Sequence, residues 1–365
     1  MKIVVLTKHY VKNYGSVLQT LATQEVLKQF CDEVVIGNYM RPEAVGANYM
    51  QAILKNRNTS NKLKTAVYKM ILYPSVMRWE KIFGDFISRR LWISEKVCTD
   101  PATLYEDLPQ ADIYCTGSDM VWNDETNGGF LPAYFLEFVP PEKKKIAFAA
   151  SFGKESFSPE QMEQLREKLK SYSAISVREE TGVPIVEQLG LKAKNVLDPS
   201  LCVDKDFWEQ FRGKNKYGDY ILIYQLYRNK RFDEYVERLA KKKGVRVVRI
   251  CTRYDYMFRG GKAVLLPKVE EWVNLFLNAR YVATDSFHGT AFSLNLGKQL
   301  VALPPQSYET RITSILSLLG IPDRYVTDYN DMTIFDREID YTKVHQLLNE
   351  QRQETLTFLK NAVSG

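Results

Sequence analysis

His288 is the side chain of this sequence best suited to acid–base chemistry. It is one of three histidines and lies in the run Thr-Asp-Ser-Phe-His-Gly-Thr at residues 284–290. Residues 280–284 predict a buried strand, and residues 290–296 predict a short helix that Gly297 closes. The amino end of such a helix attracts an anion, and ligands of α/β sheets usually bind at this edge. An imidazole there can exchange protons near neutral pH. The alternative is a histidine that only caps its own turn.

The composition is that of an ordinary soluble globular protein of two domains. The chain has 365 residues, of which 45% are hydrophobic and 26% charged. It lacks the roughly 20 continuous apolar residues of a membrane span, and its first apolar run is too short for a signal peptide, so we expect a cytoplasmic protein. Five scattered cysteines without a C-x-x-C pair favour buried thiols over disulfides or a metal site.

Positive charge is concentrated between residues 51 and 90, where nine Lys or Arg stand against two acidic residues. Such a patch can meet the phosphate groups of a lipid, a sugar carrier or a nucleic acid. Within it, Leu63, Val67, Met70 and Ile71 recur at helical spacing among lysines, as in a helix that lies on a membrane surface. The alternative is a solvated helix that packs this apolar stripe onto its domain. The basic residues are Lys55, Arg57, Lys62, Lys64, Lys69, Arg78, Lys81, Arg89 and Arg90.

Strands and helices alternate along the chain, which predicts mainly parallel sheets with right-handed crossovers. Ser16 is the expected cap of the first helix. In the first part the predicted strands are residues 2–7, 33–36, 111–115, 145–150, 174–177 and 195–197, and the helices are 16–29, 159–171 and 179–189. In the second part the strands are 220–225, 245–250, 263–266, 281–284 and 300–303, and the helices are 231–242, 269–278, 290–296 and 311–319.

The polar stretch at residues 212–218 interrupts the apolar periodicity and predicts a domain boundary. The expected fold is α/β, with two doubly wound Rossmann-like domains that face a cleft. The first domain is residues 1–212, with a basic helical insert at about 45–100, and the second is residues 213–340. A last helix at 341–365 is expected to cross back to the first domain.

Several familiar chemistries are excluded by missing motifs. The chain has neither G-x-G-x-x-G nor a P-loop, and it lacks G-x-S-x-G and H-E-x-x-H. Three scattered histidines argue against a catalytic metal site, so no metal or cofactor is expected. Low-complexity tracts and short repeats are absent, which disfavours a nucleic-acid partner.

Five segments occur in the order typical of one family: residues 13–19, 116–123, 176–180, 196–201 and 284–290. Together they resemble the polysaccharide pyruvyl transferases, which are built like the two-domain glycosyltransferases called GT-B. Met120 departs from the pattern, because the family more often has Gln there.

The resemblance implies transfer of a pyruvyl group from phosphoenolpyruvate to two hydroxyls of a sugar, which forms a cyclic ketal. A positioned acid must protonate the enol carbon, and His288 is the candidate. Guanidinium groups suit the phosphate and carboxylate of the donor. Arg178 matches a family segment, Arg228 follows a strand, and Arg311 rests on a weaker likeness. The expected donor-binding residues are Arg178, Arg228, Ser286, Phe287, Gly289 and Arg311.

The sugar acceptor is expected on the first domain. A glycine at position 15 lets the backbone approach a ligand, Asn and Asp side chains can bond hydroxyls, and Trp122 can stack on a sugar face. The alternatives are a tight turn for residues 13–15, a helix or turn cap for Asp119, and core packing for Trp122. The expected acceptor-binding residues are Asn13, Tyr14, Gly15, Asp119, Trp122 and Asn123.

Three functions remain open from the sequence. The first is a pyruvyl transferase of exopolysaccharide or capsule synthesis, acting on a polysaccharide or lipid-linked oligosaccharide, with the basic insert near anionic lipid at the inner face of the membrane. The second is a nucleotide-sugar glycosyltransferase of the same architecture, for which Glu309 is the acidic candidate for the donor ribose. The third is a non-catalytic sugar-binding protein, in which His288 would be replaceable.

Overall fold

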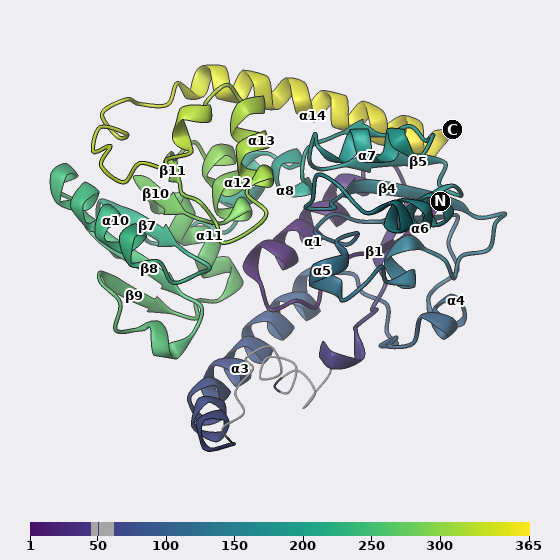
Figure 1. Ribbon diagram of the computed structural model, residues 1–365, viewed down its shortest axis with the longest axis horizontal. Helices are drawn as coiled ribbons and strands as arrows, with labels where there is room; N and C mark the ends of the chain where they lie inside the picture. Colours follow the sequence, from purple (N-terminus) through teal and green to yellow (C-terminus); the bar gives the residue numbers. More distant parts are fainter. Residues whose placement is uncertain (45–49, 51–61) are drawn as a thin grey trace. The chain divides into compact units, whose positions relative to one another are not determined.

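The computed structural model describes residues 1–44, 50 and 62–365, which form two compact units (Figure 1). Unit 1 comprises Met1–Gly46, Phe86–Val203 and Asn349–Gly365, and unit 2 comprises Ala47–Asp85 and Asp204–Leu348. Part of the predicted basic insert, including Lys55 and Arg57, lies outside the described residues. Two long helices contribute residues to both units, α3 (Lys62–Arg90) and α14 (Tyr341–Ser364).

Unit 1 is built on a six-stranded parallel sheet with the strand order β2-β1-β3-β4-β5-β6. Its strands are β1 (Lys2–Leu6), β2 (Glu33–Ile36), β3 (Ile113–Thr116), β4 (Lys144–Ala150), β5 (Ala174–Val177) and β6 (Lys194–Asn195). All neighbouring pairs run parallel, which confirms the prediction for this part of the chain. Their carboxyl ends therefore lie along one edge of the sheet.

The helices that lie wholly in unit 1 include three that were not predicted, and the other three differ from their predicted bounds by one to three residues at one or both ends. They are α1 (Tyr14–Leu27), α4 (Leu104–Asp107), α5 (Asp124–Asn127), α6 (Pro159–Leu169), α7 (Gly182–Gln188) and α8 (Pro199–Cys202). Asn13, and not Ser16, caps α1, because its side-chain oxygen accepts the backbone N–H of Gly15 at 2.8 Å. The prediction of Ser16 as the cap was therefore wrong, and Ser16 lies inside the helix.

Unit 2 is built on a five-stranded parallel sheet with the strand order β11-β10-β7-β8-β9. Its strands are β7 (Tyr220–Tyr224), β8 (Arg246–Cys251), β9 (Lys262–Leu265), β10 (Tyr281–Thr284) and β11 (Gln299–Ala302). Each neighbouring pair is parallel, so the second predicted sheet is confirmed as well.

Helices cover both faces of the unit 2 sheet (Figure 1). They are α9 (Lys205–Glu209), α10 (Lys230–Lys243), α11 (Val269–Asn278), α12 (Phe287–Asn295) and α13 (Thr310–Leu318). Ile221 and Ile223 of β7 point to one face and pack with apolar residues of α10. On the other face the ring of Tyr224 meets the ring of Trp272 of α11, with centroids 5.1 Å apart.

Helix α12 begins three residues earlier than its predicted start at Thr290. Ser286 is its N-cap, since its side-chain oxygen accepts the backbone N–H of Gly289 at 3.3 Å. His288 therefore lies in the first helical turn and not in the preceding loop.

Among the described helices, none is both long enough and apolar enough to cross a membrane.

Candidate active site

The first turn of α12 lies where the parallel strands of unit 2 end. β10 leads through Asp285 to the N-cap Ser286, and the side chains of Phe287 and His288 follow. The ring of His288 is largely buried and meets the ring of Phe287 edge-on, with centroids 5.2 Å apart. A helix of this length presents a partial positive charge at its amino end, which favours an anionic ligand.

Gly289 allows α12 to approach the sheet closely. A Cβ atom at this position would overlap the hydroxyl of Thr284, and it would lie 3.0 Å from Thr284 Cβ and 3.1 Å from a ring carbon of Tyr224. The Thr284 hydroxyl is itself fixed, because it donates to the Tyr224 carbonyl at 2.7 Å and accepts the Ser286 N–H at 3.1 Å. Gly289 thus sets the position of the turn that carries His288, which is a packing role and not evidence of a donor contact.

Asp285 connects the ends of β10 and β7. Its carboxylate accepts the backbone N–H of Leu226 at 2.7 Å and that of Tyr227 at 3.2 Å. Burial is the dominant effect on its ionisation and raises the pKa of Asp285 to about 6, although the two N–H groups act in the opposite direction. The loop that leads to Arg228 is therefore tied to the motif that carries His288.

Arg311 lies beside the same motif. Its guanidinium carbon is 6.0 Å from the centre of the Phe287 ring and 5.8 Å from that of the Tyr308 ring. Tyr308 has a left-handed backbone conformation with φ of 61°, which is uncommon for a bulky residue. The structure thus brings Arg311 and Phe287 together with His288.

Arg228 belongs to a neighbouring cluster built around Tyr256. Its guanidinium carbon lies 5.0 Å from the ring centre, and those of Arg253 and Arg259 lie at 5.2 and 5.5 Å. Asp233 forms an ion pair with Arg259 at 2.8 Å. Arg228 is exposed and stacked, which leaves the planar edge of its guanidinium suited to an anion.

In unit 1 the amino end of α1 lies against the loop that follows β3. The hydroxyl of Ser16 donates to the carboxylate of Asp119 at 2.5 Å, and the other oxygen of Asp119 accepts the Met120 N–H at 2.8 Å. Asp119 has φ of 78°, a left-handed conformation that aspartate tolerates better than most residues. Of the expected acceptor residues, Asn13, Tyr14, Gly15 and Asp119 are thus close in the fold.

Trp122 and Asn123 are turned into the core of unit 1. Trp122 is fully buried, its ring stacks on Phe135 at 5.7 Å, and its indole N–H donates to the Tyr134 carbonyl at 3.0 Å. Asn123 is also buried, where it caps α5 and donates to the Phe152 carbonyl at 2.6 Å. Both side chains thus have structural roles, and the expectation that they contact a sugar stays a prediction.

Arg178 lies in unit 1 and forms ion pairs with carboxylates. It bonds Asp198 at 3.0 Å and Glu179 at 3.1 Å, and all three side chains are buried. Burial disfavours its charge, but Glu179 and Asp198 outweigh that effect and raise the pKa of Arg178 above its ordinary value. The two carboxylates balance this guanidinium, which gives Arg178 a structural role, and its expected contact with the donor stays a prediction.

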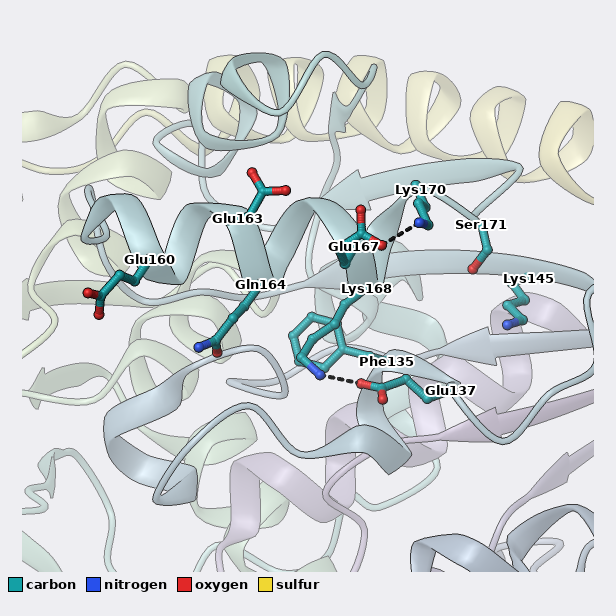
Figure 2. Close-up of a pocket in the computed structure, with 10 residues that line it drawn as sticks. All are labelled: Phe135, Glu137, Lys145, Glu160, Glu163, Gln164, Glu167, Lys168, Lys170 and Ser171. Carbon is teal, nitrogen blue, oxygen red and sulfur yellow. Dashed lines mark hydrogen bonds and ion pairs between the residues drawn. The ribbon is translucent and has the colours of Figure 1, made fainter.

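A groove of about 830 Å³ on unit 1 lies beside α6 (Figure 2). Lys145, at the amino end of β4, and Ser171, just after α6, mark its position at the edge opposite to Asp119. Figure 2 shows Lys168 paired with Glu137 and Lys170 paired with Glu167. Glu160 and Glu163 add further carboxylates, so this groove does not suit an anionic donor.

Two elements of the unit 2 site were not predicted. Asp285 could have been found, because it stands inside the motif and directly follows a strand. The cluster around Tyr256 could not, because only the folded sheet brings Arg228, which follows β7, to the stretch between β8 and β9 that carries Arg253, Tyr256 and Arg259.

The comparisons with known proteins agree on the fold. Arabidopsis thaliana UGT89C1, solved with UDP-L-rhamnose, has a TM-score of 0.52 and 10% identity, with 99% of this chain and 98% of that chain covered. A Listeria monocytogenes protein assigned as a UDP-N-acetylglucosamine 2-epimerase has a TM-score of 0.50 and 11% identity, with 94% and 90% covered. At these identities the likeness concerns the fold alone, which is the predicted GT-B-like class. No curated protein matches the chain in sequence.

The match to a protein family is more specific. Residues 13–307 match the family model described as polysaccharide pyruvyl transferase. This span includes α12 with His288 and covers more than half of the 365 residues. The chain therefore belongs to the polysaccharide pyruvyl transferase family, and it is a transferase.

Proposed function

We propose that the protein transfers the pyruvyl group of phosphoenolpyruvate to two hydroxyls of one sugar, so that a cyclic ketal and inorganic phosphate are formed. The sugar belongs to a polysaccharide or a lipid-linked precursor of exopolysaccharide or capsule. Family membership supports the reaction class. The observation that carries the residue assignment is the first turn of α12, where His288 adjoins Phe287 and Phe287 adjoins Arg311.

In this proposal His288 is the general acid. Its imidazolium protonates the methylene carbon of the enol, which makes the adjacent carbon electrophilic. One sugar hydroxyl attacks that carbon and returns a proton to the imidazole. The bond from this carbon to the phosphate oxygen then breaks, the second hydroxyl attacks, and its proton leaves with the phosphate. One phosphoenolpyruvate and one diol thus give one ketal and one phosphate.

The donor carries a phosphate and a carboxylate, and we assign its binding to unit 2. Arg228 is exposed on the loop that Asp285 holds, and Arg311 lies over the ring next to His288. Guanidinium groups bind such anions in pairs of charge-assisted hydrogen bonds. The partial positive charge at the amino end of α12 favours the same ligand. The acceptor is assigned to the amino end of α1 and to Asp119 in unit 1.

Phosphate release tests the proposal directly. The purified protein is incubated with phosphoenolpyruvate and a panel of sugar acceptors, beside His288→Gln as the catalytic control and His345→Gln as a histidine control on another helix. We expect acceptor-dependent release that falls about 100-fold or more in His288→Gln and stays near wild type in His345→Gln. No release with any acceptor, together with no thermal shift on adding phosphoenolpyruvate, would exclude this donor.

The same assay separates the other two functions. A nucleotide-sugar transferase would be active with a nucleotide sugar in place of phosphoenolpyruvate and would need Glu309, whose carboxylate accepts the Tyr325 hydroxyl at 2.7 Å. A non-catalytic protein would keep its biological effect in His288→Gln.

A further inference from the structure

Helix α3 is apolar on two opposite faces over its first sixteen residues (Lys62 to Met77). Because each residue of an α-helix is rotated by about 100° from the one before, the apolar positions of this segment fall into two stripes on opposite sides of the helix. One stripe is buried and packs within unit 2, where Leu72 and Val76 meet Met50, Tyr68 and Trp79. The other stripe consists of apolar side chains that are between 47% and 76% exposed: Leu63, Val67, Met70, Ile71, Tyr73 and Met77.

The exposed stripe contradicts the simpler alternative drawn from the sequence, in which Leu63, Val67, Met70 and Ile71 pack onto the domain. The buried stripe with Leu72 and Val76 is the one that packs onto the domain. Hydrogen bonds fix this orientation, because Trp79 donates to the Thr252 carbonyl at 2.7 Å and the Ser75 hydroxyl accepts the Tyr254 N–H at 3.0 Å. The helix therefore cannot rotate its outer stripe inward without losing these bonds.

Basic residues flank the exposed stripe. On a helical projection Lys64 falls on one side of it and Lys69 on the other, and both side chains are exposed. Arg78 and Lys81 follow near its end. An exposed apolar stripe bordered by lysines is the pattern of a helix that lies in the plane of an anionic bilayer surface. The apolar side chains enter the headgroup region, and the lysines meet lipid phosphates.

We propose that the outer face of α3, defined by Leu63, Val67, Met70, Ile71, Tyr73 and Met77, docks unit 2 onto the surface of an anionic lipid membrane. Charge complementarity selects this occupant, since a protein partner would not require lysines on both borders of the stripe. The surface and its test do not depend on pyruvyl transfer, so either proposal can fail without the other.

The docking face is also connected to the candidate donor site. Arg253 donates to the Tyr68 hydroxyl of α3 at 2.5 Å, and its guanidinium carbon lies 5.2 Å from the centre of the Tyr256 ring. Arg228 stacks on that same ring. A membrane-bound α3 would thus hold the Tyr256 loop, and with it Arg228, at a fixed position relative to the lipid surface.

Vesicle co-sedimentation of the full chain tests the docking face. The probes are vesicles of phosphatidylcholine alone and vesicles that also contain phosphatidylglycerol, each at low and high salt. We expect binding to the anionic vesicles only, and weaker binding at high salt. Val67→Glu with Met70→Glu should weaken it by about tenfold or more, and Lys64→Glu with Lys69→Glu by about tenfold at low salt.

Control variants distinguish membrane binding by this face from general effects of surface charge or of a damaged fold. Leu318→Glu changes an exposed apolar residue of α13, and Lys192→Glu with Lys241→Glu removes the same number of lysines elsewhere. These controls should bind as wild type does, and every variant should keep the wild-type melting temperature. Absence of binding to anionic vesicles, or equal losses in the controls, would overturn the proposal. A self-association of the chain that Met70→Glu abolishes would overturn it too, because the occupant would then be a second copy.

Discussion

The carboxylate of Asp285 accepts the backbone N–H of Leu226 at 2.7 Å, which ties the end of β10 to the end of β7. These strands are parallel neighbours, with Thr284 opposite Tyr224 in the register. One strand leads to His288 and the other to Arg228. Asp285 therefore holds the proposed acid and one proposed donor ligand in a fixed relation, although its own carboxylate is occupied by backbone groups.

Replacement of Asp285 by Asn should change how stability depends on pH. Burial raises the pKa of Asp285 to about 6 from an ordinary value of 3.8, so the folded protein holds this proton more tightly than the unfolded chain. The stabilisation from this proton is complete below pH 3.8 and is lost as pH rises through 6, which amounts to about 3 kcal/mol as an upper value. The amide side chain of Asp285→Asn does not ionise, so this variant should not lose that stabilisation as pH rises.

Urea unfolding at a series of pH values measures the effect. The difference in free energy of unfolding between wild type and Asp285→Asn should change between pH 4 and 6 and stay constant above pH 7. Asp219→Asn, which removes an exposed carboxylate elsewhere in unit 2, serves as the control for the loss of one carboxylate. If the free energy of unfolding changed with pH in the same way for wild type and Asp285→Asn, the raised pKa of Asp285 would be contradicted.

Arg228 and Arg231 form a matched pair for donor binding. Both stack on tyrosine rings, Arg228 on Tyr256 at 5.0 Å and Arg231 on Tyr329 at 4.9 Å, but only Arg228 lies on the loop that Asp285 holds. Arg228→Gln should raise the KM for phosphoenolpyruvate by about 10- to 100-fold, since a charge-assisted hydrogen bond contributes about 1.5–3 kcal/mol. Arg231→Gln should leave the KM within about twofold of wild type. Equal effects of the two changes on KM would show that Arg228 has no special contact with the donor.

Arg178 should act on stability and not on donor binding. Removing it as Arg178→Met leaves the carboxylates of Glu179 and Asp198 buried without their cation, which should lower the free energy of unfolding by about 3–5 kcal/mol. The double variant Arg178→Met with Glu179→Gln should recover part of this loss, because one buried charge is removed. Urea unfolding of both variants checks this expectation. A stable Arg178→Met protein with a raised KM for phosphoenolpyruvate would restore Arg178 as a donor ligand.

Most strands were predictable because they read as mainly apolar runs, but β6 (Lys194–Asn195) is polar and only overlaps its predicted range. Tyr281–Thr284 has its predicted bounds, and Val269–Asn278 of α11 does as well, since its apolar residues recur at helical spacing. Helix starts were less predictable. The first turn of α12 contains Phe287 and His288, which are weak helix formers, and it is fixed by the Ser286 cap and by close packing of Gly289.

The sequence suggests candidate site residues but does not reveal their environment. The sequence identified Arg178, yet its partner Asp198 is twenty positions away and comes from another strand end. Polar neighbours suggested an accessible loop around Trp122, but its enclosure depends on Phe135, Phe152 and Tyr172, which no local pattern reveals. Such contacts arise from tertiary packing and override local preference.

Trp122 provides a test of whether the sequence pattern or the packed environment describes its role. Trp122→Phe removes the indole N–H that bonds the Tyr134 carbonyl and leaves space between Phe135 and Phe152, so the free energy of unfolding should fall by about 1–3 kcal/mol. The exposed Trp92 is the matched control, and Trp92→Phe should cost about 0.5 kcal/mol or less. Because the ring of Trp122 is enclosed, the KM for the sugar acceptor should not change in Trp122→Phe, whereas it would rise if the indole stacked on the sugar. Urea unfolding and acceptor kinetics on the same two variants therefore distinguish a core tryptophan from a sugar platform.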